Sequence, residues 1–152
     1  MRRLSLPVRP EWRAEAEALG FRFHTIAGEP YWVDDAAWAF TLRQVEDDIE
    51  SASADLHAMA LDLVGEVVRS EALMTRLGIP EPYRDWIAAS WARRDRHLYG
   101  RMDLAYTGQG PAKLLEFNYD TPTSLYESAC FQWLWLEARI ARGELPAGTD
   151  QY

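Results

Sequence analysis

Lysine and cysteine are almost absent from this 152-residue sequence, which contains only Lys113 and Cys130 of these two types. A single cysteine excludes an internal disulfide framework and any zinc site that needs several cysteines. With one lysine and no glycine-rich phosphate-binding motif, the chain lacks the groups that usually hold nucleotide phosphates. If this chain takes part in binding a nucleotide, other groups must hold most of the nucleotide phosphates.

The sequence also lacks an excess of positive charge and long apolar runs. Its formal net charge is −8 at pH 7, whereas a general nucleic-acid or anionic-membrane binder needs a basic stripe. No apolar run approaches the roughly 20 residues that span a bilayer. The charged N-terminal residues are not followed by the apolar segment of a secretory signal. We therefore expect a cytoplasmic protein with no nucleic-acid or membrane partner.

The remaining composition is that of a folded protein of the α+β class. A chain of this length forms one domain or a large part of one, and it buries roughly 68–70% of its unfolded surface. We predict a single domain over residues 1–152, mainly helical, with a long amphipathic helix and a central antiparallel β-hairpin. Short helices are expected over residues 10–19, over residues 70–77 and from Pro80 onward, and residues 1–9 are expected to form a loose or extended arm.

Apolar residues at spacings of three and four predict the long helix. Either Asp34 or Asp35 is expected to cap its start. The apolar stripe consists of Trp38, Leu42, Val45, Ile49, Ala52, Leu56, Met59, Leu63 and Val67. The opposite face is acidic, which usually means only that the face is solvated. An attraction for a polyamine is the alternative interpretation.

The stretch over residues 101–118 has the pattern of a β-hairpin. Polar and apolar side chains alternate along residues 101–107, and the same alternation can be followed along residues 113–118. The four residues from Gly108 to Pro111 lie between them and are a strong turn signal. The sequence therefore predicts two antiparallel strands joined by a short loop.

A turn tip at Gln109 and Gly110 determines which residues face one another. Directly opposed side chains share a face of the hairpin, with β-carbons roughly 5 Å apart. Four polar residues are then expected on one face, with Arg101 opposite Asn118 and Asp103 opposite Glu116. The other face is expected to carry apolar side chains that suit a core, namely Met102, Leu104, Leu115 and Phe117. A slip of one residue would move the polar set to the other face.

Two opposed carboxylates repel unless a shared proton, a basic neighbour or a metal ion relieves the repulsion. Arg101 is one such neighbour. Mg²⁺ is another, because it accepts carboxylate and amide oxygens beside waters and phosphates. An arginine beside such a cation is suited to bind the same phosphate. The polar face therefore predicts either a Mg²⁺–phosphate site or a solvated surface with an ordinary salt bridge.

The string from Arg101 to Glu127, with LLEFNYDTPTSLYE at its centre, resembles the glutathionylspermidine synthase family of ATP-grasp ligases. The strings PYWVDDAAW and FQWLWLE extend the resemblance more loosely to the whole chain. Members of the family phosphorylate the glycine carboxylate of glutathione with ATP, and an amine of a polyamine then displaces the phosphate. The resemblance implies an ATP-dependent C–N ligase, of which this chain is similar to the N-terminal, preATP-grasp-like portion.

The resemblance also implies roles for individual residues. Asp103, Glu116 and Asn118 match Mg²⁺ ligands. Arg101 matches a catalytic residue that contacts the transferred phosphate of ATP and the acyl-phosphate or tetrahedral species. The cofactors implied are ATP and Mg²⁺. The substrates implied are a thiol peptide such as glutathione and a polyamine or other amine.

The loop after the hairpin leads into the last predicted helix. Thr121 and Thr123 match positions that contact the thiol-peptide substrate in the family, although each suits a plain helix cap equally well. Ser124 and Glu127 have capping-box spacing, so a helix is expected from there to about Arg142. The middle of this helix, FQWLWLE, is apolar on nearly all sides, and self-association of the chain is expected if it stays partly exposed.

Two functions of other classes stay open beside the ligase. Family members carry a long further segment with the ATP-grasp parts, so this chain alone is expected to be inactive. It is alternatively a non-catalytic module that binds a peptide or polyamine. The third interpretation is a structural helical domain whose hairpin carboxylates face water.

Overall fold

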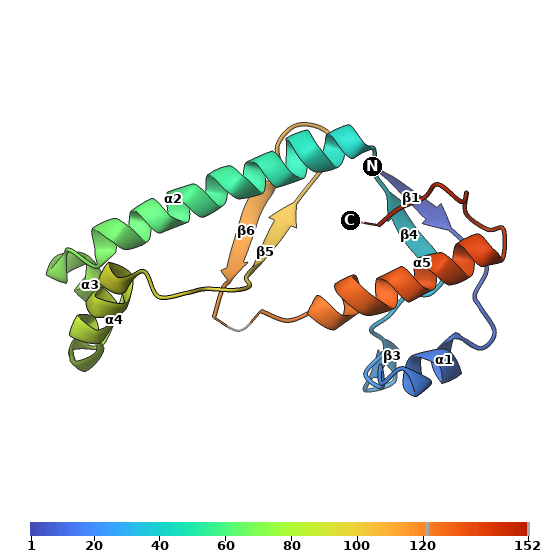
Figure 1. Cartoon of the computed structure of the whole chain (residues 1–152), viewed down its shortest axis with the longest axis horizontal. Coiled ribbons are helices and arrows are strands. Elements are labelled where there is room, and N and C mark those ends of the chain that lie inside the picture. Colours follow the sequence, from blue (N-terminus) through green and yellow to red (C-terminus); the bar gives the residue numbers. More distant parts are fainter. Residues whose placement is uncertain (121, 152) are drawn as a thin grey trace. The chain divides into compact units, whose positions relative to one another are not determined.

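The computed structural model describes residues 1–120 and 122–151 and divides into two compact units (Figure 1). The terminal unit contains Met1–Val45 and Pro122–Tyr152, and the hairpin unit contains Glu46–Thr121. Helices dominate, and the strand pairs of the described residues are antiparallel, so the α+β class is confirmed. The single domain expected over residues 1–152 stays a prediction.

The terminal unit combines two small sheets with three helical segments. β1 (Arg2–Ser5) pairs with β4 (Ala36–Ala39), and β2 (Thr25–Ile26) pairs with β3 (Glu29–Pro30). The helical segments are α1 (Trp12–Ala18), the π-helical η2 (Glu127–Phe131) and α5 (Gln132–Ala141). The N-terminal arm is therefore a paired strand rather than a loose segment, because β4 supplies its hydrogen-bonding partner.

The start of the long helix differs from the prediction. Trp38 lies in β4, and the helical segment begins after Thr41 with the π-helical η1 (Gln44–Glu50). The Thr41 N–H donates to Gln44 Oε1 at 3.0 Å, and the Gln44 N–H donates to Thr41 Oγ1 at 3.2 Å. This reciprocal pair is a capping box, which satisfies two backbone donors at the helix start. The predicted cap at Asp34 or Asp35 is wrong.

Asp34 is instead the buried centre of an ion-pair network in the terminal unit. Its side chain is 2% exposed and accepts from Arg9 at 2.7 Å and from Arg139 at 2.9 Å. Trp135 Nε1 donates to the Asp34 carbonyl oxygen at 2.9 Å. Two buried guanidinium groups on one buried carboxylate satisfy the rule that buried charges are paired.

The apolar core of the terminal unit lies beside this network. It is formed by Trp12, Ala16, Phe21 and Phe131, with Trp32 and Tyr126 packed against it. The rings of Phe21 and Phe131 are 4.5 Å apart between centroids. The predicted last helix is thus confirmed as η2 followed by α5, and its residues Phe131, Trp135 and Leu136 are buried, whereas Trp133 is partly exposed.

The hairpin unit contains the rest of the long helical segment and the β-hairpin. Its elements after η1 are α2 (Ser51–Val67), α3 (Glu71–Arg76), α4 (Glu81–Arg93), β5 (Arg101–Ala105) and β6 (Lys113–Asn118). Ser70 caps α3 by accepting from the Leu73 N–H at 3.3 Å. Pro80 precedes the first residue of α4, as its fixed φ angle favours. The predicted helices in this region are confirmed.

The apolar stripe of α2 is only partly covered. Ala52, Gly65 and Val67 are buried, whereas Met59 and Leu63 are 66% and 57% exposed. Among the described residues, no helix has both the length and the apolar character needed to cross a bilayer.

Candidate functional site

The β5–β6 hairpin lies beside the long helical segment (Figure 1), and Asp48 of η1 connects the two. The Tyr106 hydroxyl donates to Asp48 Oδ2 at 2.5 Å. The Ala112 N–H donates to the Asp48 carbonyl oxygen at 2.7 Å. Asp48 is 5% exposed, so both ends of the loop that joins the strands are held at a buried point. Sequence patterns did not indicate Asp48, because its partners lie far along the chain.

The register of the two strands is the one predicted from the turn. Arg101 pairs with Asn118, and Asp103 pairs with Glu116. The two carboxylates are therefore opposed on neighbouring strands, with the arginine and the asparagine beside them. The structure brings together four of the six predicted site residues on one face of one hairpin.

A β-bulge follows directly after the opposed carboxylates. Leu104 pairs with Leu114 rather than with Leu115, so Leu115 is the extra residue of β6. Leu115 is 70% exposed and Phe117 is 37% exposed. The predicted core role of Leu115 is wrong, because the bulge removes it from the alternation that the rest of β6 follows.

Hydrogen bonds connect the polar residues of the face in a chain. Arg101 Nε donates to Asp103 Oδ1 at 2.8 Å, with 29% of the arginine side chain and 40% of the aspartate side chain exposed. This hydrogen bond, followed by the charges of Asp103 and Glu116, raises the pKa of Arg101 above its ordinary value. The guanidinium therefore stays charged and neutralises part of the repulsion between the carboxylates.

The Asn118 amide continues this chain of hydrogen bonds. Its nitrogen donates to Glu116 Oε1 at 3.1 Å, and its oxygen accepts from Arg101 Nη2 at 3.0 Å. This orientation gives each amide atom a partner of the right kind. The polar face is therefore satisfied by its own hydrogen bonds, and a cation bound to the Asn118 oxygen would require that oxygen to give up its bond with Arg101.

The hairpin face offers oxygen ligands of the kind that hard cations bind. Among the described residues, no group of three or more His, Cys, Asp or Glu side chains is arranged to hold a metal ion. A metal on this face would take two carboxylates and one amide oxygen, a set that Mg²⁺ accepts because it keeps several waters. The residues present therefore fit Mg²⁺ better than a metal that prefers nitrogen or sulfur ligands.

Tyr119 closes one end of the hairpin and was not indicated by sequence reasoning. Its hydroxyl lies 3.2 Å from His57 Nδ1, which belongs to α2. A β-carbon added at Gly100 would lie 2.5 Å from Tyr119 Cδ1. Partial burial raises the pKa of Tyr119 above its ordinary 10.0, so its hydroxyl stays protonated at neutral pH. The glycine directly before the first strand is the signal that a close approach of this kind was needed.

The substrate contacts expected of Thr121 and Thr123 stay predictions. Thr121 lies outside the described residues, and Thr123 is exposed in the segment that precedes the last helical stretch. The predicted capping box of Ser124 and Glu127 does not form. Ser124 has a positive φ of 72°, and Glu127 Oε1 accepts from the Tyr31 hydroxyl at 2.6 Å instead.

Comparison with known proteins gives the chain a family. A family model described as "Glutathionylspermidine synthase preATP-grasp" matches residues 3–152. A "Putative acid--amine ligase" of Haemophilus influenzae is 36% identical over 134 residues, which cover 86% of this chain and 33% of that protein. A "Bifunctional glutathionylspermidine synthetase/amidase" of Escherichia coli is 25% identical over 128 residues, which cover 84% of this chain and 20% of that protein. The chain thus spans about a third or less of the length of these relatives.

Proposed function

Because the chain belongs to the glutathionylspermidine synthase family and corresponds to its preATP-grasp part, we propose that it supplies the metal- and phosphate-binding hairpin of an ATP-dependent ligase. The reaction is the joining of a carboxylic acid to an amine through an acyl phosphate. The observation that carries this proposal is the strand register, which pairs Asp103 with Glu116 and Arg101 with Asn118. The related ligases support the reaction class.

Asp103, Glu116 and Asn118 are the residues that would hold Mg²⁺. When bound, the ion supplies positive charge that neutralises the phosphate oxygens as the phosphoryl group transfers. The paired carboxylates support this role, since their opposition is relieved by a cation.

Arg101 is the residue that would stabilise charge on the transferring phosphoryl group. Arg101 donates to both Asp103 and Asn118. A cation held by these two residues would take over their contacts with the arginine. The guanidinium would then be available to donate to phosphate, for which its planar fork of N–H groups is suited.

The substrates proposed are ATP, a thiol peptide such as glutathione, and a polyamine or other amine. Thr121 and Thr123 are proposed to contact the peptide. This part rests on the family resemblance of these two positions. The location proposed for the protein is the cytoplasm.

The test is ADP formation by the protein at its natural full length, with Mg²⁺, glutathione and a panel of amines. ADP release that requires both an acid and an amine supports the ligase. ATP binding without turnover would be consistent with a ligase whose acid or amine substrate is not among those tested. No ATP binding contradicts the proposal and leaves the non-catalytic binding module or the structural domain.

Arg101→Ala separates the catalytic role from a structural one. We expect it to lower kcat about 100-fold or more, because groups that stabilise transition-state charge have effects of this size. Its stability to denaturant should change little, because the ion pair with Asp103 is partly exposed to solvent. Arg93→Ala, which removes another exposed ion pair of the hairpin unit, is the matched control. Equal losses of activity and stability in Arg101→Ala would contradict the role.

A further inference from the structure

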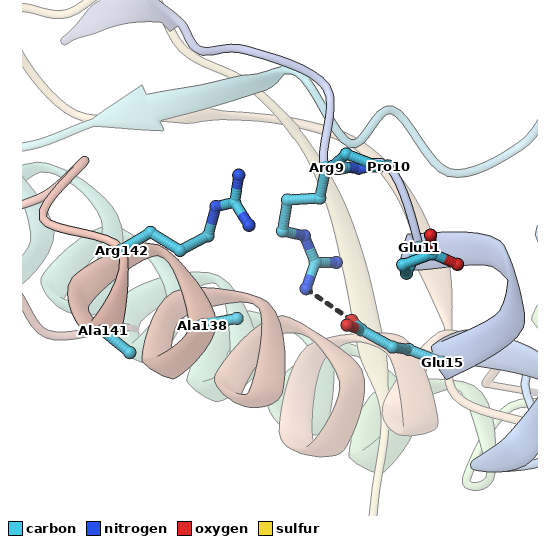
Figure 2. A pocket seen from close by; sticks show the side chains of 7 residues that line it. All are labelled: Arg9, Pro10, Glu11, Glu15, Ala138, Ala141 and Arg142. Carbon is cyan, nitrogen blue, oxygen red and sulfur yellow. Dashed lines mark hydrogen bonds and ion pairs between the residues drawn. The ribbon is translucent and has the colours of Figure 1, made fainter.

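The terminal unit contains a cavity that shares no residue with the hairpin face. Its volume is about 420 Å³ (Figure 2). Its lining consists of Arg9, Pro10, Glu11, Glu15, Ala138, Ala141 and Arg142. A volume of this size lies within the range of roughly 300–1,000 Å³ that small-molecule sites occupy. The lining carries charges of both signs, and the two alanines leave the floor over α5 open.

Arg9 is a buried and fixed part of the cavity wall rather than a mobile surface arginine. Its side chain is 5% exposed and is oriented by three hydrogen bonds. Nε and Nη2 donate to Asp34, and Nη1 donates to Glu15 at 3.0 Å. A guanidinium has five N–H donors. Two donors of Arg9 therefore have no partner among the described residues, and a ligand in the cavity can accept from them.

Arg142 presents a second guanidinium to the same space. Figure 2 shows its guanidinium group directed toward that of Arg9, above Ala138. Its Nε donates to Glu144 at 2.8 Å, so the stem of the group is held while the terminal nitrogens face the cavity. The hydrogen bond to Glu144 first, and then charges that include those of Glu15 and Asp34, raise the pKa of Arg142.

The opposite side of the cavity is acidic. Glu15 is bonded to Arg9, and 52% of its side chain is exposed. The Glu11 carboxylate is exposed and has no ion-pair or hydrogen-bond partner among the residues that the structure describes. A ligand with only negative charge would meet these two carboxylates, and a ligand with only positive charge would meet the two arginines.

We propose that this cavity binds a small zwitterion of the α-amino acid class. The ligand carboxylate accepts from the open N–H groups of Arg142 and Arg9. The ligand ammonium donates to Glu11 and Glu15. Bonds from charged donors to a carboxylate are the strong kind, and each end of the ligand finds its opposite charge only when both ends are present.

The test is saturation-transfer NMR on the full chain with glycine, acetate and methylamine as probes, without ATP. We expect glycine to bind about tenfold or more tightly than acetate or methylamine, because each of these lacks one charged contact. Arg142→Gln and Glu11→Gln should each weaken glycine binding by about tenfold. Arg93→Gln, which changes an arginine outside the cavity, should leave it unchanged.

Three results would overturn the proposal. Acetate that binds as tightly as glycine would make the cavity an anion site, and methylamine that does so would make it a cation site. No saturable signal with glycine, or glycine binding that Arg142→Gln leaves intact, would remove the site. Because the probes need neither ATP nor Mg²⁺, a failed ligase assay and a failed glycine titration are separate results.

Discussion

Arg101 and Asn118 connect the two carboxylates of the hairpin face. Arg101 donates to Asp103 and to the Asn118 amide oxygen. The Asn118 amide nitrogen in turn donates to Glu116. The face is therefore satisfied by its own hydrogen bonds. This property depends on an amide, since a third carboxylate would add repulsion and could not donate.

The lowered pKa of Glu144 makes the stability of the terminal unit depend on pH. Hydrogen bonds from Arg142 and Arg139 lower the pKa of Glu144 below its ordinary 4.5. Because the folded pKa is lower than the unfolded one, this stabilisation is fully present above pH 4.5. It is lost as the pH falls through the folded pKa. The Arg139 side chain, which donates to Glu144, is fully buried.

We expect Glu144→Gln to reduce the loss of stability that acid causes below pH 4.5. The measurement is urea unfolding of wild type and variant at pH values above and below this point. Glu137→Gln, which removes an exposed carboxyl of α5, is the control. A wild-type protein and a Glu144→Gln variant with parallel pH profiles would contradict the role of Glu144.

At the scale of elements, the hairpin is positioned by contacts at both of its ends. Asp48 holds the loop end through Tyr106 and Ala112. Tyr119 holds the open end through His57, with its ring packed against Gly100. These contacts link the strands to the π-helical η1 and to α2, so the polar face has a fixed support.

Gly100→Ala should disturb the open end of the hairpin. The added β-carbon would lie 2.5 Å from Tyr119 Cδ1 and 3.0 Å from Tyr119 Cγ, so the whole ring has to shift. We expect a loss of about 1–3 kcal/mol in the free energy of unfolding, as for other overpacked sites. Gly148→Ala, where no atom lies within 4 Å of the added carbon, is the control. If the clash is the cause, adding Tyr119→Ala to Gly100→Ala recovers stability; two purely additive effects would show that it is not.

Tyr106→Phe should weaken the loop end of the hairpin. It leaves the buried Asp48 Oδ2 without its hydroxyl donor, at a cost of about 1–3 kcal/mol in the free energy of unfolding. The Ala112 bond is unaffected, because it goes to the Asp48 backbone. Tyr83→Phe removes a half-exposed hydroxyl of α4 and is the control. Denaturant unfolding measures both variants, and equal stabilities would contradict a role for Asp48 as the anchor.

Local periodicity predicted the parts of the structure whose causes are local. The alternation along both strands and the turn between them were sufficient for the pairing of Asp103 with Glu116. Local patterns did not predict the bulge at Leu115, since an extra residue leaves the composition of the strand unchanged. They also assigned Asp34 to a helix cap, although its partners Arg9 and Arg139 lie 25 and 105 residues away. Contacts at such separations have no signature in a single sequence.

At the scale of the molecule, the family match identifies the chain, whereas its exposed apolar surface concerns self-association. The match over residues 3–152 makes this chain a member of the family. The hairpin unit exposes several large apolar side chains, among them Trp86 at 69% and Leu98 at 100%. Self-association through such surfaces stays a prediction. The proposed ligase role depends on whether the hairpin face binds a metal ion.

The most direct test of the proposed metal site is Mn²⁺ binding, followed by electron paramagnetic resonance, to the protein at its natural full length. Mn²⁺ accepts the same oxygen ligands as Mg²⁺. We expect Glu116→Gln to weaken Mn²⁺ binding by about tenfold or more, because it removes a charged ligand. Glu81→Gln, an exposed position on α4, should have no effect. Equal Mn²⁺ affinity in wild type and Glu116→Gln would contradict the account and would make the hairpin carboxylates a solvated surface.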